Sequence, residues 1–99
     1  MRIGIVTGGN RGIGFEVVRG LVLESDLDKI ILCSRSIKNG EEAVQKLQDE
    51  FGQKSNLCEV AKLDLANGES IENFAAYIKE NAFIETNHTK FIVPKSYKL

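Results

Sequence analysis

The stretch Thr7-Gly8-Gly9-Asn10-Arg11-Gly12-Ile13-Gly14 decides the fold of this 99-residue chain. It follows an apolar run of strand length, Arg2-Ile3-Gly4-Ile5-Val6, and precedes a segment with apolar residues at helical spacing. A glycine-rich turn between a strand and a helix is the setting of a phosphate-binding loop. Without a Cβ, Gly8 and Gly12 can take positive φ and present N–H groups to a pyrophosphate, while Gly14 permits close helix packing. The alternative is a tight turn that binds no ligand.

Length and composition limit what this chain can be. Its 99 residues suffice for one domain, and 42% of them are hydrophobic and can form a core. They do not suffice for all the strands of a complete doubly wound dinucleotide enzyme. A net charge of −1 gives no basic surface for nucleic acid. No apolar run approaches the ~18 residues of a membrane-spanning helix, and the first strand leaves no room for a signal peptide. We therefore expect a cytoplasmic protein that binds neither nucleic acid nor membrane.

The two cysteines and the single histidine carry no predicted chemistry. Cys33 and Cys58 lie in apolar, strand-like runs and form no Cys-x-x-Cys pair, so we expect two buried thiols in a reducing compartment. His88 has no companions at metal-ligand spacing. No metal site is predicted.

Apolar periodicity predicts an α/β fold in which strands and helices alternate. The expected strands are residues 2–7, 30–33 and 57–64, and the expected helices are residues 12–25, 38–51 and 67–82. Parallel strands joined through a helix form a unit that is almost always right-handed. The chain is therefore predicted to form a partial Rossmann fold, a doubly wound parallel sheet with about three strands and three helices.

Several side chains have expected places in these elements. Ile13, Val17 and Leu21, with Val22 as a further candidate, are expected on the buried face of the first helix, where Gly20 suggests close packing. Tyr77 falls outside the apolar stripe of the third helix and is expected to be a surface or rim residue rather than an acid. The third strand alternates more than the first two, which predicts a position at the sheet edge.

The end of the second strand indicates which dinucleotide the loop would bind. NAD-binding units place an acidic residue about 20 residues beyond the glycines, where it bonds the adenosine ribose. Here that place holds Ser34-Arg35-Ser36, with no carboxylate. The guanidinium of Arg35 suits a 2′-phosphate, and Arg11 in the glycine turn could approach the same group. This pattern favours NADPH over NADH; the alternative for each arginine is a solvated loop side chain.

Asp64 and Leu65 follow the third strand at the side of the sheet that carries the glycine turn and Arg35. Ligands of open α/β sheets bind along this carboxyl-end side. Two roles for Asp64 follow from its position, and the sequence does not separate them. Its carboxylate could accept a hydrogen bond from the adenine amine, or it could begin the next turn.

Together these motifs resemble the short-chain dehydrogenase/reductase family. The similarity lies in Thr7-Gly8-x-x-x-Gly12-Ile13-Gly14, in Ser34-Arg35 and in Asp64-Leu65, and it covers roughly residues 2–82. The stretch Asn10-Arg11-Gly12-Ile13-Gly14-Phe15-Glu16 is particularly similar to the NADPH-dependent carbonyl reductases of that family. The resemblance implies a site for NADPH or NADP⁺, a small-molecule dinucleotide. Its residues would be Gly8, Asn10, Arg11, Gly12, Ile13, Gly14, Arg35, Asp64 and Leu65.

The chain also departs from the family pattern. It contains no Tyr-x-x-x-Lys pair, whose tyrosine is the family's general acid, so no catalytic residue is predicted and this chain alone is expected to be inactive or nearly so. Residues 1–82 are predicted to be the NADPH-binding Rossmann portion, and residues 83–99 a divergent C-terminal tail. Within the tail, residues 90–93 are apolar and β-favouring. We expect them to form a fourth strand beside the first, or else to belong to a disordered end.

Three functions remain open on the sequence. The first is the NADPH-binding portion of a carbonyl-reductase-like oxidoreductase, whose full-length relatives transfer hydride to a carbonyl compound. The second is a non-catalytic module that binds NADPH or a partner, including a second copy through an exposed sheet edge. The third is a truncated product that binds no cofactor.

Overall fold

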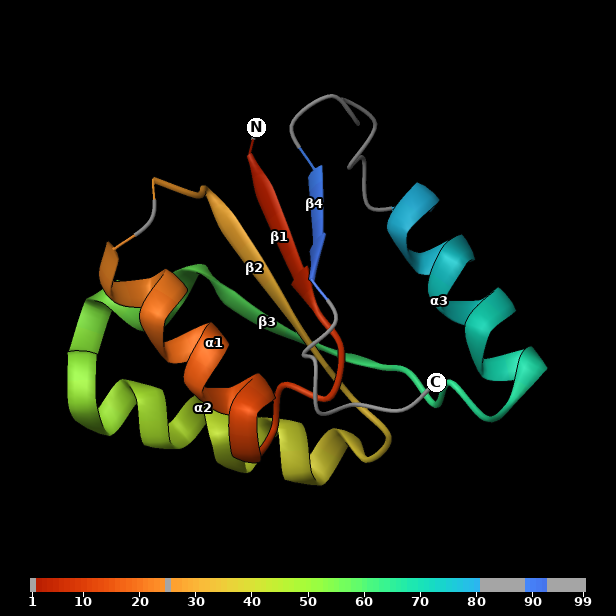
Figure 1. Cartoon of the computed structure of the whole chain (residues 1–99), viewed down its shortest axis with the longest axis horizontal. Coiled ribbons are helices and arrows are strands. Elements are labelled where there is room, and N and C mark those ends of the chain that lie inside the picture. Colours follow the sequence, from red (N-terminus) through yellow and green to blue (C-terminus); the bar gives the residue numbers. More distant parts are fainter. Residues whose placement is uncertain (1, 25, 81–88, 93–99) are drawn as a thin grey trace.

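The structure is a computed structural model that describes residues 2–24, 26–80 and 89–92. Within these ranges the elements are β1 (Ile3–Val6), α1 (Gly12–Glu24), β2 (Lys29–Ser34), α2 (Ile37–Phe51), the 3₁₀ helix η1 (Gly52–Leu57), β3 (Cys58–Lys62), α3 (Gly68–Glu80) and β4 (Thr89–Ile92). Figure 1 shows the strands side by side with the helices around them. The predicted α/β class is confirmed, with strands and helices alternating along the chain.

The four strands form one parallel sheet in the order β3-β2-β1-β4. Ile3 of β1 lies opposite Lys29 of β2 on one side and opposite Thr89 of β4 on the other. The chain therefore moves outward from β1 to β3 and then crosses to the far side of β1, which makes the sheet doubly wound. The predicted edge position of the third strand is confirmed. The predicted strand beside β1 is confirmed for residues 90–92, whereas Val93 and His88 lie outside the described residues.

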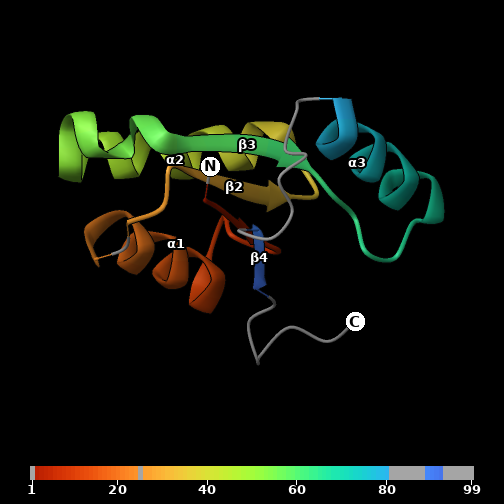
Figure 2. The ribbon, with the colours of Figure 1, turned by 90° about the horizontal axis from the view of Figure 1, so that it is seen from above.

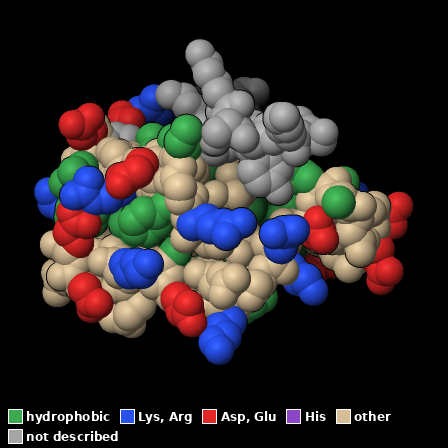
Figure 3. Space-filling model, turned by 60° about the horizontal axis from the view of Figure 1, so that its bottom comes forward, with side chains coloured by type: hydrophobic (Ala, Val, Ile, Leu, Met, Phe, Trp, Pro, Cys, Tyr) green, Lys and Arg blue, Asp and Glu red, His purple; other side chains and the backbone are tan. Residues whose placement is uncertain are grey.

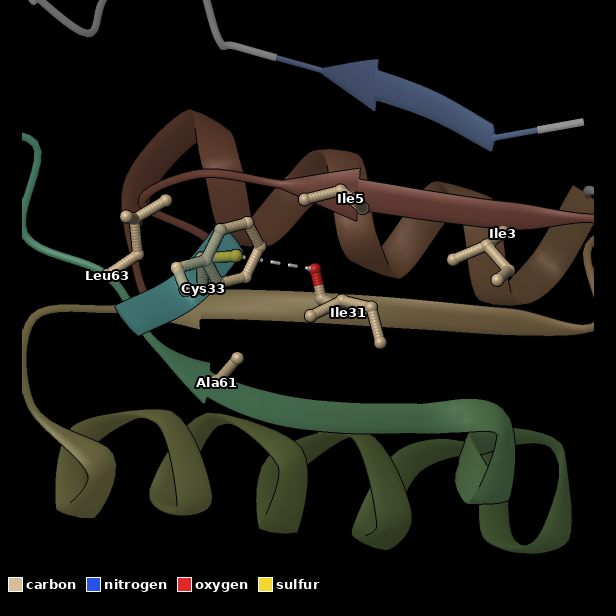
Figure 4. Packing of buried hydrophobic residues seen from close by; sticks show 7 residues of the cluster. Ile3, Ile5, Ile31, Cys33, Ala61 and Leu63 are labelled. Atoms are coloured by element: carbon tan, nitrogen blue, oxygen red, sulfur yellow. Dashed lines mark hydrogen bonds between the residues drawn. The ribbon is translucent and has the colours of Figure 1, made fainter. Parts of the chain in front are cut away.

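The core has two layers because strand side chains alternate between the faces of the sheet. α1 and α2 cover one face, with a cluster of Val6, Val18, Val22, Ile30, Leu32, Ala43 and Leu47. α3 contributes to the other face, with Ile3, Ile5, Ile31, Cys33, Ala61, Leu63 and Phe74. Figure 2 shows α3 lying away from α1 and α2, and Figure 4 shows the second cluster at close range. Successive residues of β2 thus point into the two core layers in turn. Because both layers are buried, the strand has a continuous apolar run.

On the expected buried face of α1, Val22 is confirmed and Val17 and Leu21 are partly buried against the same cluster, whereas Ile13 is wrong. Ile13 is 52% exposed, and the buried residues of the helix are Gly14, Val18 and Val22. The buried face thus begins at a residue without a side chain, where the helix packs against the glycine loop, so apolar spacing alone misplaced it. The predicted close packing at Gly20 is also wrong, because a Cβ there would meet nothing within 4 Å.

Tyr77 of α3 takes the second of its two expected positions, at the rim of a cavity between β3 and α3. Tyr77 is half-buried and packs against the second cluster, with its ring centroid 6.3 Å from that of Phe74. Its hydroxyl donates a hydrogen bond to Glu59 of β3. Burial, together with this carboxylate, raises the pKa of Tyr77 well above its ordinary value. The side chain fastens α3 to the edge strand, a role that the apolar stripe does not reveal.

Candidate functional site

The glycine loop joins β1 to α1 at the carboxyl end of the sheet. Gly8 and Gly12 both have φ of 61°. A residue with a Cβ in this left-handed region pays roughly 1–2 kcal/mol, so the turn favours glycine at both positions. The positive φ that the sequence led us to expect is therefore present at each of them.

Two further glycines let the loop lie close to its neighbours. A Cβ on Gly14 would stand 2.1 Å from the carbonyl oxygen of Gly8. A Cβ on Gly9 would stand 2.9 Å from Cγ of Leu32 in β2. The N–H of Gly9 also donates to the carbonyl oxygen of Cys33, 2.9 Å away. The loop is thus held across the ends of two neighbouring strands.

The start of α1 supplies the electrostatics of the loop. The helix begins at Gly12, and the first N–H groups of an α-helix have no acceptor within the helix. These groups carry the positive end of the helix dipole, equivalent to about half an elementary charge. No acidic residue stands in the first turn to compensate it. This end of α1 therefore suits an anionic ligand.

A cavity of about 400 Å³ brings the loop together with the end of β2. It is lined by Gly8, Asn10, Arg11, Gly12, Ile13, Gly14, Ser34, Arg35, Ser36, Asn39 and Leu63. Seven of the residues expected to bind the cofactor thus share one cavity, although Arg35 is distant from the loop in sequence. The exposure of Ile13, which contradicts its expected place in the core, puts it at this cavity.

The backbone on either side of Arg35 is fixed by the serines that flank it. Ser34 is buried, and its Oγ accepts from the N–H of Ser36 at 3.3 Å. Ser36 in turn caps α2, its Oγ accepting from the N–H of Asn39 at 3.2 Å. Arg35 itself is exposed, as is Arg11. Figure 3 shows basic side chains near the middle of this side of the molecule. The two guanidinium groups can therefore reach an anion in the cavity from different elements.

Asp64 belongs to a second cavity, of about 630 Å³, between β3 and α3. This cavity also includes Arg35, so one arginine borders both spaces. The Oδ1 of Asp64 accepts from the N–H of Ala66 at 3.0 Å, and its carbonyl oxygen accepts from the N–H of Asn67 at 3.0 Å. Asp64 thus begins a turn, the second of its two expected roles. That role occupies one carboxylate oxygen and leaves Oδ2 available for the first.

The remaining residues differ from the expectation in two ways. Leu65 lines neither of these cavities and is packed, partly buried, against the α3-side cluster. Ser34, Ser36 and Asn39 line the loop cavity and were not expected there. The N-cap spacing of Ser36 and Asn39 was the available signal, since a serine that caps a helix after β2 must lie at this side of the sheet.

A candidate metal site and a candidate membrane-spanning helix are both absent from the part of the chain that the structure describes. No three His, Cys, Asp or Glu side chains there are grouped so that they could hold a metal ion. Within the same ranges, no helix has the length and apolar character needed to cross a membrane.

The fold and the loop define a dinucleotide-binding unit of the Rossmann type. A glycine turn between β1 and α1, at the carboxyl end of a doubly wound parallel sheet, is the arrangement that places a pyrophosphate at a helix N-terminus. The sequence profile of the family described as short chain dehydrogenase matches residues 2–84. The chain belongs to this family, as its motifs predicted.

Individual relatives agree with this assignment. Short-chain dehydrogenase anuD of Penicillium roqueforti is 44% identical over 71 residues, which is 72% of this chain and 18% of that protein. The structure of menthone neomenthol reductase from Mentha piperita superposes with a TM-score of 0.72 at 35% identity, over 82% of this chain and 28% of that one. A metagenomic short-chain oxidoreductase solved with NADP shares the fold alone: it superposes with a TM-score of 0.61 at 24% identity, over 81% of this chain and 34% of that one. The chain therefore spans between 18% and 34% of the length of these relatives.

Proposed function

We propose that residues 1–82 are the NADPH-binding portion of a carbonyl-reductase-like short-chain oxidoreductase. The observation that carries this proposal is the loop cavity, in which the glycine turn, Arg11 and Arg35 line one space. A phosphate-binding loop alone would suit either nicotinamide dinucleotide. The two guanidinium groups, and the lack of a carboxylate in Ser34-Arg35-Ser36, favour the dinucleotide that carries a 2′-phosphate.

The donor set of the cavity fits such a cofactor. Gly8, Gly12 and the start of α1 would face the pyrophosphate with backbone N–H groups. Arg35 would take the 2′-phosphate with its planar fork of N–H donors, and Arg11 would add a second positive charge. Asp64 would accept from the adenine amine through Oδ2, with Leu65 beside it. Asn10, Ile13 and Gly14 complete the residues that we assign to the site.

When bound, NADPH would supply the hydride, and the chain's own residues would hold and orient it. The 99 residues contain no Tyr-x-x-x-Lys pair to position a substrate and donate a proton. We therefore propose that reduction of a carbonyl compound requires residues that these 99 do not provide, and that this chain alone is inactive or nearly so. Its two cysteines are free, which fits the cytoplasmic location we propose.

Calorimetric titration of the chain with NADP⁺ and NAD⁺ at low salt tests the cofactor assignment. We expect tighter binding of NADP⁺, and Arg35→Ala should weaken it about ten- to a hundredfold, because a charge-assisted hydrogen bond is lost. NAD⁺ affinity should change little. Lys38→Ala is the matched control, since it removes an exposed positive charge from α2 that does not line the cavity. Equal affinities for the two nucleotides, or equal losses in both variants, would refute the proposed role of Arg35.

A second candidate function is partner binding, and the position of β4 supports it. β4 ends the strand order, so one of its edges has no strand beside it within the described ranges. Edge strands with free N–H and C=O groups pair readily with other chains. Self-association through this edge should appear as a concentration-dependent mass in sedimentation experiments, and Phe91→Lys should suppress it. A monomer at all accessible concentrations would exclude this function.

A further inference from the structure

The turn between β3 and α3 holds Asp64 by three hydrogen bonds. Its N–H donates to Oγ of Ser70 at 2.8 Å, and its carbonyl oxygen accepts from the N–H of Asn67 at 3.0 Å. Its Oδ1 accepts from the N–H of Ala66 at 3.0 Å. These bonds fix the backbone on both sides of the Cα and one of the two carboxylate oxygens. The remaining oxygen, Oδ2, therefore has a defined direction.

Ser70 makes a contact that its place in α3 does not require. Asn67 is the N-cap, its Oδ1 accepting from the N–H of Ser70 at 3.1 Å, so Ser70 occupies the third helical position. In a capping box, a Glu or Gln side chain at that position reaches back to the N–H of the cap residue. The hydroxyl of Ser70 instead reaches six residues back, to the last residue before the turn. It thus joins the first turn of α3 to the end of β3.

We infer that Ser70 is a positioning residue for nucleotide recognition, holding the Asp64 carboxylate toward the adenine 6-amino group. This inference rests on the proposed function, because it requires a dinucleotide in the site. Ser70 and Asp64 line the same cavity as Arg35, which we assign to the 2′-phosphate. Without the hydroxyl, the Asp64 N–H loses its acceptor, and only the bonds to the N–H groups of Ala66 and Asn67 still hold the turn. The carboxylate would then keep its charge but be less firmly directed.

The chemistry of the purine ring offers a direct readout of this direction. The adenine 6-amino group donates a hydrogen bond, and a carboxylate oxygen can only accept one. In nicotinamide hypoxanthine dinucleotide phosphate, a carbonyl oxygen replaces the amine and faces the carboxylate with a second acceptor. A well-directed Asp64 should therefore prefer NADP⁺ over this analogue about tenfold, as expected for a hydrogen bond to a charged group.

Calorimetric titration of the whole chain with both nucleotides, in wild type and variants, tests the inference. Ser70→Ala should reduce the preference to about threefold or less, mainly by weakening NADP⁺ binding. Ser70→Thr, which keeps the hydroxyl, should restore it. Ala76→Gly is the control: Ala76 is exposed on α3 and does not line this cavity. Glycine there lowers helix propensity and thermal stability, yet the preference should remain because the turn that holds Asp64 is unchanged.

Each contrary result points to a different step. A full preference in Ser70→Ala, or an equal loss in Ala76→Gly, would overturn the role of Ser70 alone. Equal binding of both nucleotides by the wild type would overturn the assignment of Asp64 to adenine, and that of Ser70 with it. No binding of either nucleotide by the wild type would refute the proposed function and the inference together.

Discussion

Gly14 lies so close to the carbonyl oxygen of Gly8 that a Cβ on Gly14 would stand 2.1 Å from it. A real Cβ essentially never lies within 3.0 Å of a heavy atom outside its own residue and its chain neighbours. The atom in the way belongs to the backbone, so a change of rotamer cannot relieve the clash. This contact sets how near the first turn of α1 lies to the loop that precedes it, and hence where its N–H groups point.

Gly14→Ala should therefore destabilise the chain and disturb the loop. We expect a loss of about 1–3 kcal/mol in the free energy of unfolding, as for other overpacked sites. NADP⁺ binding should fall as well, because the loop must move to admit the methyl group. Urea denaturation followed by far-UV circular dichroism measures the first effect, and calorimetry the second.

Gly20→Ala serves as the control in the same helix. A Cβ at Gly20 meets nothing within 4 Å, so alanine should raise stability by about 1 kcal/mol through its helix propensity alone. Equal effects of the two substitutions would contradict the close contact at Gly14.

Thr7→Val should stabilise the protein. Thr7 is 1% exposed, and its Oγ1 has no hydrogen-bond partner among the described residues. A buried, unpaired polar group costs about 1–3 kcal/mol, and valine replaces the hydroxyl with a methyl group of similar size. We expect a gain of about 1 kcal/mol or more in urea denaturation, and a loss in Thr7→Ser, which keeps the hydroxyl and removes the methyl group. A loss of stability in Thr7→Val would mean that the hydroxyl is paired.

Gly40 and Val60 should behave as a coupled pair. A Cβ on Gly40, in α2, would stand 2.5 Å from Cγ1 of Val60 in β3. Gly40→Ala should therefore cost stability despite the higher helix propensity of alanine. Val60→Ala makes room for the new methyl group, so the double variant should be less destabilised than the sum of the single ones. A coupling energy of about 1 kcal/mol in a double-mutant cycle would fit contact, and strict additivity would contradict it.

Alkaline pH should destabilise the chain partly through Cys33. Burial raises the pKa of its thiol from 9.0 to about 12. Between these values the unfolded chain releases the proton while the folded chain retains it, so stability falls as pH rises, by up to ~1.4 kcal/mol per pH unit. Figure 4 shows the sulfur among apolar side chains of the sheet.

Urea denaturation at several pH values from 8 to 11, under reducing conditions, measures this contribution. Cys33→Ala should be less stable than wild type at pH 8 but should lose less stability as pH rises above 9. For Cys58, burial raises the pKa of the thiol only to about 11. Cys58→Ala should therefore reduce the loss of stability over a narrower pH range than Cys33→Ala does. Parallel curves for wild type and Cys33→Ala would refute the contribution of Cys33.

β4 should protect its amides from hydrogen exchange. Thr89–Ile92 pairs with Ile3–Val6 along its whole length, so the β4 amides bonded to β1 should exchange slowly. The amide of Glu69 is a suitable reference, because it lies in the exposed first turn of α3 and has no acceptor within the helix. Exchange in β4 as fast as at Glu69 would argue against the fourth strand.

Much of the fold could be predicted because its causes are local. The apolar runs of β1 and β2 and the glycine turn each depend on residues within a few positions of one another. The edge position of β3 could be predicted from its alternating pattern, and the place of β4 from the apolar, β-favouring residues of the tail. For the same reason, the glycines of the loop and the cation at Arg35 could be named as candidate site residues before their geometry was known.

Contacts between distant elements could not be predicted in this way. The sequence by itself determined the α/β pattern, the turn at Gly8 and Gly12, and the replacement of a carboxylate by Arg35, because glycine conformation and side-chain charge are properties of single residues. Only the tertiary structure decided that Ile13 faces the cavity, that Tyr77 fastens α3 to Glu59, and that Ser70 holds Asp64. Those relationships depend on how closely helices approach the sheet, and that distance is set by the packing of the whole core.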